Sequence, residues 1–171
     1  MEYVLGGLAV LGFAWLTVLV HESGHLLAGR VFGVPSSQIR IVLGNPSHVA
    51  LRAGDRWLGP DDPDYVEAFR SHREEPWVSW VFVAAGLALE TCTAALAIAA
   101  LTGTGRAASA TLWAWTTGGL AMGYLVLDLV GTARARRPVG DHSALWQISP
   151  PATLMFLTVV TTVKLATVAL V

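Results

Sequence analysis

Four long stretches of this sequence carry almost no charge, and they restrict the possible fold more than any other feature. Tyr3–Val20 and Ala107–Leu127 contain no charged residue in 18 and 21 positions, respectively, whereas Pro76–Leu101 and Pro150–Val171 contain one each. A helix needs roughly 20 residues to cross the hydrocarbon core of a bilayer. We therefore expect an all-α integral membrane protein with about four transmembrane helices, over residues 3–32, 76–101, 107–130 and 150–171.

The composition agrees with a chain that lies mostly in a lipid bilayer. Hydrophobic residues make up 54% and charged residues only 13%, whereas an ordinary soluble domain has roughly 25% charged residues. A net charge of −1 provides no basic surface, so nucleic acid is not an expected partner. The single cysteine, Cys92, excludes an internal disulfide and a cysteine-based zinc cluster. Residues 1–171 are expected to form one domain, and the first segment to be a retained helix, because Glu2 replaces the basic start of a signal peptide.

A polar loop, residues 33–75, separates the first two apolar stretches. Gln38–Leu43 and His48–Arg52 have the composition of short strands, and the turn sequence "GNPS" lies between them. These features predict a small β-hairpin after the first helix. The acidic, arginine-rich and proline-rich remainder of the loop is expected to be solvated, with one helical turn.

Arginines indicate which side of the membrane each loop occupies. Six lie between Arg30 and Arg73, and three more follow the third apolar stretch at Arg134, Arg136 and Arg137. If all four helices span, these two regions share one face, which the positive-inside rule assigns to the cytoplasm. We expect an integral protein of a bacterial-type cell membrane, with a cytoplasmic hairpin and both termini outside.

The sequence "HESGH", residues 21–25, interrupts the first apolar stretch with three ionisable side chains. Residues four apart lie on one face of a helix, so His21 and His25 can bind the same metal ion. Zinc lowers the pKa of bound water to about 7, and Glu22 can serve as the general base for that water. Alternatively, both histidines are neutral core residues that hydrogen-bond to neighbouring helices, although this leaves Glu22 unexplained. Ionisable groups within a membrane helix favour a functional site.

The chain resembles the site-2 protease family of intramembrane zinc metalloproteases. The resemblance rests on "HESGH" late in the first helix, the extended segment after it, and a later aspartate preceded by a membrane helix. The stretch "AAGLALETCTAAL", Ala84–Leu96, is similar to the family's Gly-Pro-x-x-Asn pattern. Gly86 matches that pattern, Leu87 replaces the proline and Glu90 occupies the asparagine position.

The resemblance implies an aspartate as the third zinc ligand, and two residues fit. Asp141 follows a proline and opens an apolar stretch, as the family aspartate does, although His142 replaces the usual glycine. Asp128 then stands where the family has a loop asparagine, and would orient a ligand or the substrate. We favour Asp141 as the ligand, and the reverse assignment stays open. Glu90 either holds a ligand imidazole or contacts substrate backbone, or it is a protonated carboxyl group in the helix bundle.

These features predict an intramembrane zinc metalloendopeptidase, with Glu22 as the catalytic residue and His21, His25 and Asp141 as metal ligands. It would cleave a transmembrane or membrane-proximal segment of a membrane protein substrate, with its active site towards the cytoplasm. An edge of the hairpin could hold an extended substrate segment by strand addition. One alternative is a non-proteolytic membrane protein that binds metal or a partner on a degenerate protease scaffold. Another is a transporter or channel subunit, which would conduct ions and would not need Glu22.

Overall fold

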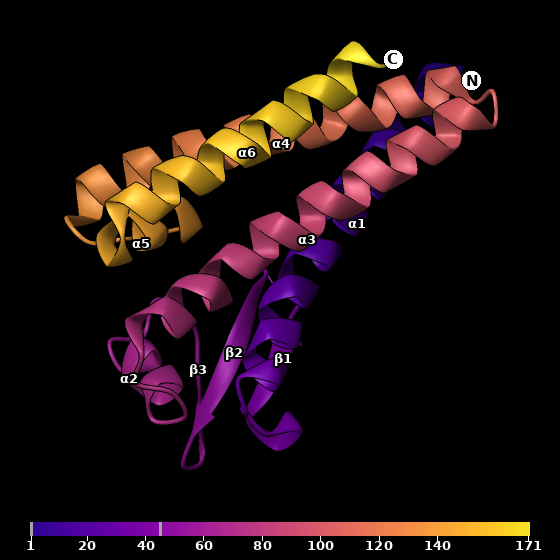
Figure 1. The fold of residues 1–171 in the computed structure, drawn as a ribbon. Helices are drawn as coiled ribbons and strands as arrows, with labels where there is room; N and C mark the ends of the chain where they lie inside the picture. Colours follow the sequence, from indigo (N-terminus) through magenta and orange to yellow (C-terminus); the bar gives the residue numbers. More distant parts are fainter. Residues whose placement is uncertain (1, 45) are drawn as a thin grey trace.

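The computed structural model of the protein describes residues 2–44 and 46–171, and it is mostly helical (Figure 1). Four long helices dominate the described chain, and two short helices lie in the connections between them. In chain order the helices are α1 (Glu2–Val31), α2 (Tyr65–Arg70), α3 (Pro76–Gly103), α4 (Ala107–Ala135), α5 (Asp141–Ile148) and α6 (Pro150–Ala169). A 3₁₀ turn, η1 (Ser36–Gln38), follows α1.

The long helices run alternately in opposite directions, with α1 beside α3 and α4 beside α6 (Figure 1). A small sheet and α2 lie where α1 ends and α3 begins. The short helix α5 lies at the end of the α4–α6 pair that is distant from the end of α6. The long loop and the α4–α6 connection thus lie at the same end of the helices.

Among the described residues, three helices are long and apolar enough to cross a membrane, and α4 is not among them. The candidate spans are Gly6–Val31, Pro76–Gly103 and Pro150–Ala169. In an apolar stretch of 18 residues within each span, only 11% of the residues are buried in α1 and in α6, against 44% in α3. So much exposed apolar surface needs a nonpolar surrounding. The structure therefore agrees with a helical membrane protein, and it has three candidate spans where four were expected.

The loop after α1 forms a three-stranded antiparallel sheet, so the prediction of a two-stranded hairpin was incomplete. The strands β1 (Ile39–Val42), β2 (His48–Ala53) and β3 (Arg56–Leu58) lie in that order across the sheet. The two-residue connection from β2 to β3 is Gly54-Asp55, and Gly54 has a φ of +59°. A Gly-Asp pair between short strands is a hairpin signal, because glycine adopts positive φ without strain. The third strand was therefore visible in the sequence and was overlooked.

The strand β2, which includes the predicted strand His48–Arg52, is the central strand, so it offers less free edge for strand addition than β1 does. β2 pairs with β1 along one side and with β3 along part of the other, where Tyr65 also donates a hydrogen bond to the Val49 carbonyl. The two edge strands of the described sheet are β1 and β3. The sheet is fixed to the end of α1 and the start of α3 by a buried cluster of Val34, Ile39, Val49, Leu51, Phe69, Val78 and Phe82.

The connection before α6 was expected to be a polar interruption, but part of it forms α5. Leu145 is fully buried and packs with Ala84 and Leu87 of α3 and with side chains of α6. This contact fixes α5 against α3 and α6. It also determines where the first residue of α5, Asp141, can lie.

Candidate metal centre

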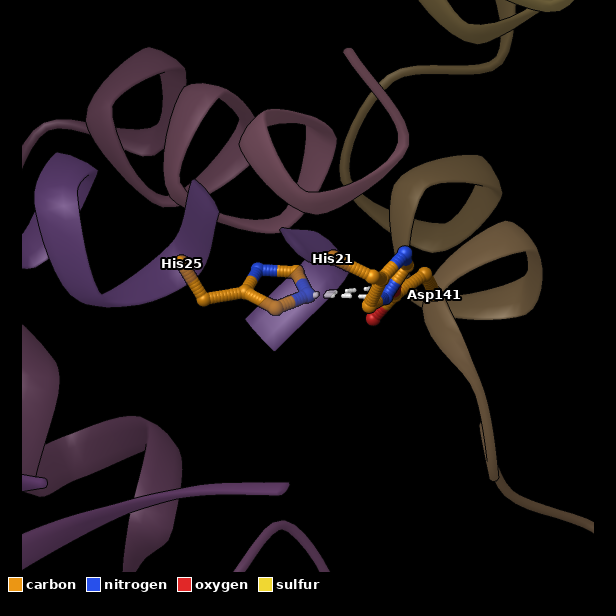
Figure 2. A group of neighbouring side chains, drawn as sticks. All are labelled: His21, His25 and Asp141. Carbon is orange, nitrogen blue, oxygen red and sulfur yellow. Dashed lines mark hydrogen bonds and ion pairs between the residues drawn. The ribbon is translucent and has the colours of Figure 1, made fainter. Parts of the chain in front are cut away.

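The side chains of His21, His25 and Asp141 converge on one point (Figure 2). Both histidines lie on α1, where a spacing of four residues places them one turn apart. Their Nε2 atoms are 3.1 Å apart, and Oδ2 of Asp141 lies 2.8 Å from Nε2 of His21 and 3.2 Å from Nε2 of His25. The structure therefore brings Asp141, not Asp128, to the two histidines.

The donor set and its spacing fit a zinc ion. Two imidazole nitrogens and one carboxylate oxygen are the ligands found in catalytic zinc sites, which leave a fourth position open. Ligand atoms ~2.0–2.1 Å from a tetrahedral ion lie about 3.4 Å apart. The three separations of 2.8, 3.1 and 3.2 Å are a few tenths of an ångström shorter. Small side-chain movements would suffice to admit the ion.

The other nitrogen of each imidazole has an acceptor, which fixes the hydrogen positions. Nδ1 of His25 donates to the backbone carbonyl of Phe82 at 2.9 Å, and Nδ1 of His21 lies 3.3 Å from Oε2 of Glu90. A carbonyl can only accept, so the hydrogen of neutral His25 is on Nδ1. When a metal ion is bound, both Nε2 atoms would be unprotonated and would face the ion together with the Asp141 carboxylate. Such a cluster of electron-rich atoms favours a bound cation.

The histidines hold Asp141 in its ionised form. Burial by itself would raise the pKa of this carboxyl group, but without a metal ion the charge of protonated His25 and hydrogen bonds from both imidazoles outweigh the effect of burial. The pKa of Asp141 therefore lies below its usual range. A metal ligand must be deprotonated, so Asp141 is already in the required state at neutral pH.

Two glycines let α1 and α3 approach closely enough to form the site. A Cβ atom on Gly24 would collide with the backbone carbonyl of Ala85. One on Gly86 would lie 2.9 Å from Nε2 of His21 and closer still to Nε2 of His25. Gly86 thus leaves room for the imidazoles, a role that its place in a sequence pattern did not reveal.

Glu22 is buried beside the histidines, with only 7% of its surface exposed. It directly follows His21 in α1. Within the described part of the chain, its carboxylate has no side-chain hydrogen-bond partner.

Asp128 lies outside the metal cluster and anchors the start of α5. It is 5% exposed and accepts hydrogen bonds from the backbone nitrogens of Gly140 and Ser143 and from the hydroxyl of Thr132. The Ser143 hydroxyl also donates to it. Asp141 lies between Gly140 and Ser143, so Asp128 fixes the turn that carries Asp141. This agrees with a supporting role for Asp128 in place of direct coordination.

Glu90 lies behind His21 and contacts Lys164 as well. Its Oε1 is 2.7 Å from Nζ of Lys164, while Oε2 faces His21. The sequence offered a signal for this pair, because these are the only charged residues in their two apolar stretches and such residues usually pair with each other. No role was predicted for Lys164 from the sequence. The acceptor for the other histidine, His25, is the Phe82 carbonyl. This is a backbone group, so no pattern of side chains could have predicted it.

Comparisons of the chain with known protein families, with curated proteins and with solved structures find no match. The resemblance to site-2 proteases stays a prediction that rests on the residues described above.

Proposed function

We propose that the protein is an intramembrane zinc metalloendopeptidase of the site-2 protease type. The observation that carries this proposal is the convergence of His21, His25 and Asp141 beside Glu22, a buried carboxylate without a side-chain hydrogen-bond partner among the described residues. A site that only bound metal would not need Glu22, whereas hydrolysis needs a general base.

His21, His25 and Asp141 would hold the ion, and Glu22 would transfer protons. Bound zinc supplies a Lewis acid that lowers the pKa of water to about 7. The Glu22 carboxylate takes a proton from the attacking water and delivers it to the leaving amine nitrogen of the scissile peptide. Asp141 and His21 are 28% and 19% exposed at their side chains, so water and substrate can approach this side of the cluster.

The topology that fits this activity has four spans, with α4 as the additional one. A helix of 29 residues is about 43 Å long at 1.5 Å per residue, enough to cross a bilayer. On α4, Trp115, Met122, Leu127 and Leu129 are all more than half exposed, as expected for a helix surrounded by lipid. The arginines at the sheet end and after α4 favour a cytoplasmic location for that end and for the approach to the metal cluster.

The edge strand β1 offers a place for the substrate. A peptide bond within a helix is shielded by the helical hydrogen bonds, so a transmembrane substrate must be extended locally before it is cut. Strand addition to Ile39–Val42 would hold such a segment by main-chain hydrogen bonds. The substrate class is therefore a transmembrane or membrane-proximal segment of another membrane protein.

Glu22→Gln tests the proposed mechanism. The purified protein in proteoliposomes is supplied with zinc and a panel of fluorescently labelled transmembrane peptides. We expect the parent to cleave at least one peptide, a zinc chelator to stop the cleavage, and Glu22→Gln to bind zinc normally while losing cleavage by at least 100-fold. General acid–base catalysis typically contributes 10²–10⁴-fold. Glu67→Gln is the matched control, because Glu67 is exposed on α2.

Three results would contradict the proposal. If Glu22→Gln cuts as fast as the parent, Glu22 is not the base. If zinc does not bind the parent, there is no metal centre. If zinc binds but no peptide is cleaved, the protein is better described as a non-proteolytic metal-binding membrane protein.

A further inference from the structure

A line of three polar side chains connects the C-terminal helix to the metal cluster. Lys164 of α6 contacts Glu90 of α3 at 2.7 Å, and Glu90 contacts His21 of α1 at 3.3 Å. The side chains of Glu90 and Lys164 are only 6% and 14% exposed. Three separate helices thus meet through one carboxylate, whose two oxygens have one partner each.

Lys164 supplies a positive charge beside the Glu90 carboxylate inside an apolar helix bundle. A buried carboxylate without a counter-charge is costly, so charged groups in membrane helices pair with each other. Because Lys164 occupies Oε1, the carboxylate plane is held with Oε2 towards Nδ1 of His21. Without the ammonium group, His21 would be the only described side chain within hydrogen-bond distance of this carboxylate.

The two histidines differ in how they are oriented. Nδ1 of His25 donates to the carbonyl of Phe82, a backbone acceptor that belongs to α3 itself. Nδ1 of His21 depends on a side chain, Glu90, and through it on α6. Acceptors of this kind fix the tautomer and ring orientation of a metal-binding histidine, and their loss typically weakens metal binding 10–100-fold.

We infer that Lys164 is a positioning residue of the metal centre, which acts through Glu90 to orient His21. Metal affinity would then depend on the docking of α6, although α6 contributes no ligand. This inference rests on the metal centre of the proposed function and adds a residue and a helix to it.

Metal titrations of the purified full-length protein in detergent test this inference. Co²⁺ is the probe, because its visible absorption reports both affinity and ligand geometry, and Zn²⁺ competition checks the affinity. We expect Lys164→Met to weaken Co²⁺ binding about tenfold and to change the absorption spectrum, while Lys164→Arg, which keeps the charge, stays within about threefold of the parent. If Glu90→Gln is already present, adding Lys164→Met should have almost no further effect, because both changes disable the same contact.

Thr153→Val is the matched control for a merely structural role of α6. Thr153 is fully buried on α6 and accepts a hydrogen bond from Trp80 of α3 at 3.1 Å, apart from the Glu90 contact. Thr153→Val therefore weakens the docking of α6 without touching Glu90, and we expect its Co²⁺ affinity and spectrum to match the parent.

Parent-like Co²⁺ binding by Lys164→Met would overturn the inference and leave the metal centre standing. An equal loss of affinity in Thr153→Val, or effects of Lys164→Met and Glu90→Gln that simply add, would also overturn it. A parent protein that binds neither Co²⁺ nor Zn²⁺ would instead refute the proposed metal centre, and the inference with it.

Discussion

Replacing Gly86 with alanine is the most direct test of the geometry at the metal centre. The added methyl group would lie 2.9 Å from Nε2 of His21 and closer to Nε2 of His25. These are the two nitrogens expected to bind the ion. Gly86→Ala therefore changes neither a ligand nor the base, and acts only by occupying space.

The size of the effect follows from the distances. Ordinary van der Waals contact begins at about 3.4 Å, so the His21 nitrogen would have to retreat by about 0.5 Å and the His25 nitrogen by more. Functional metal sites tolerate displacements of only about 0.5 Å, and metal–ligand distances hold within about 0.2 Å. We expect zinc affinity to fall by roughly 10–100-fold, similar to the loss of a hydrogen bond that orients a ligand.

Gly86→Ala should stabilise the helix α3 while it weakens zinc binding, so the two effects can be distinguished. Alanine is a better helix former than glycine by roughly 1 kcal/mol in a helix interior. A loss of affinity in Gly86→Ala therefore cannot be attributed to a weakened α3. Gly118→Ala on α4 is the matched control, because an added Cβ there meets nothing within 4 Å.

Zinc affinity is measured by competition with a fluorescent chelator, and helical content by circular dichroism. The expected result is weak binding by Gly86→Ala, parent-like binding by Gly118→Ala, and equal helicity in all three proteins. If Gly86→Ala binds zinc as tightly as the parent, the imidazoles do not point at Gly86 and the proposed coordination geometry is wrong.

Two further predictions follow from the ligand-bearing helix α5. Asp128→Ala removes none of the three ligand residues, but the turn that carries Asp141 loses its anchor, so zinc binding should weaken about tenfold. A zinc titration with unchanged affinity would refute this prediction. Zinc at 100 times its dissociation constant should stabilise the parent by about 2.7 kcal/mol, seen as a higher thermal midpoint. Asp141→Asn should remove most of that gain, and an equal gain would show that Asp141 is not a ligand.

Features that depend on neighbouring residues could be predicted from the sequence. The apolar stretches predicted the four long helices closely, since α3 and α4 begin at Pro76 and Ala107 as expected. The local spacing of His21 and His25 was sufficient to place both imidazoles on one helix face. The third strand was missed although its Gly54-Asp55 turn signal is local, and α5 was missed because eight residues with mixed polarity give a weak helical pattern.

The sequence by itself determined that long apolar helices form and that one of them carries two histidines one turn apart, because backbone hydrogen bonding and side-chain period are local properties. Only the tertiary structure decided which distant groups reach those histidines. Asp141 rather than Asp128 lies at the cluster because the burial of Leu145 against α3 fixes α5 there. Glu90 meets both His21 and Lys164 because three helices pack side by side. Such contacts join residues far apart in the chain, and no local pattern encodes the packing that brings them together.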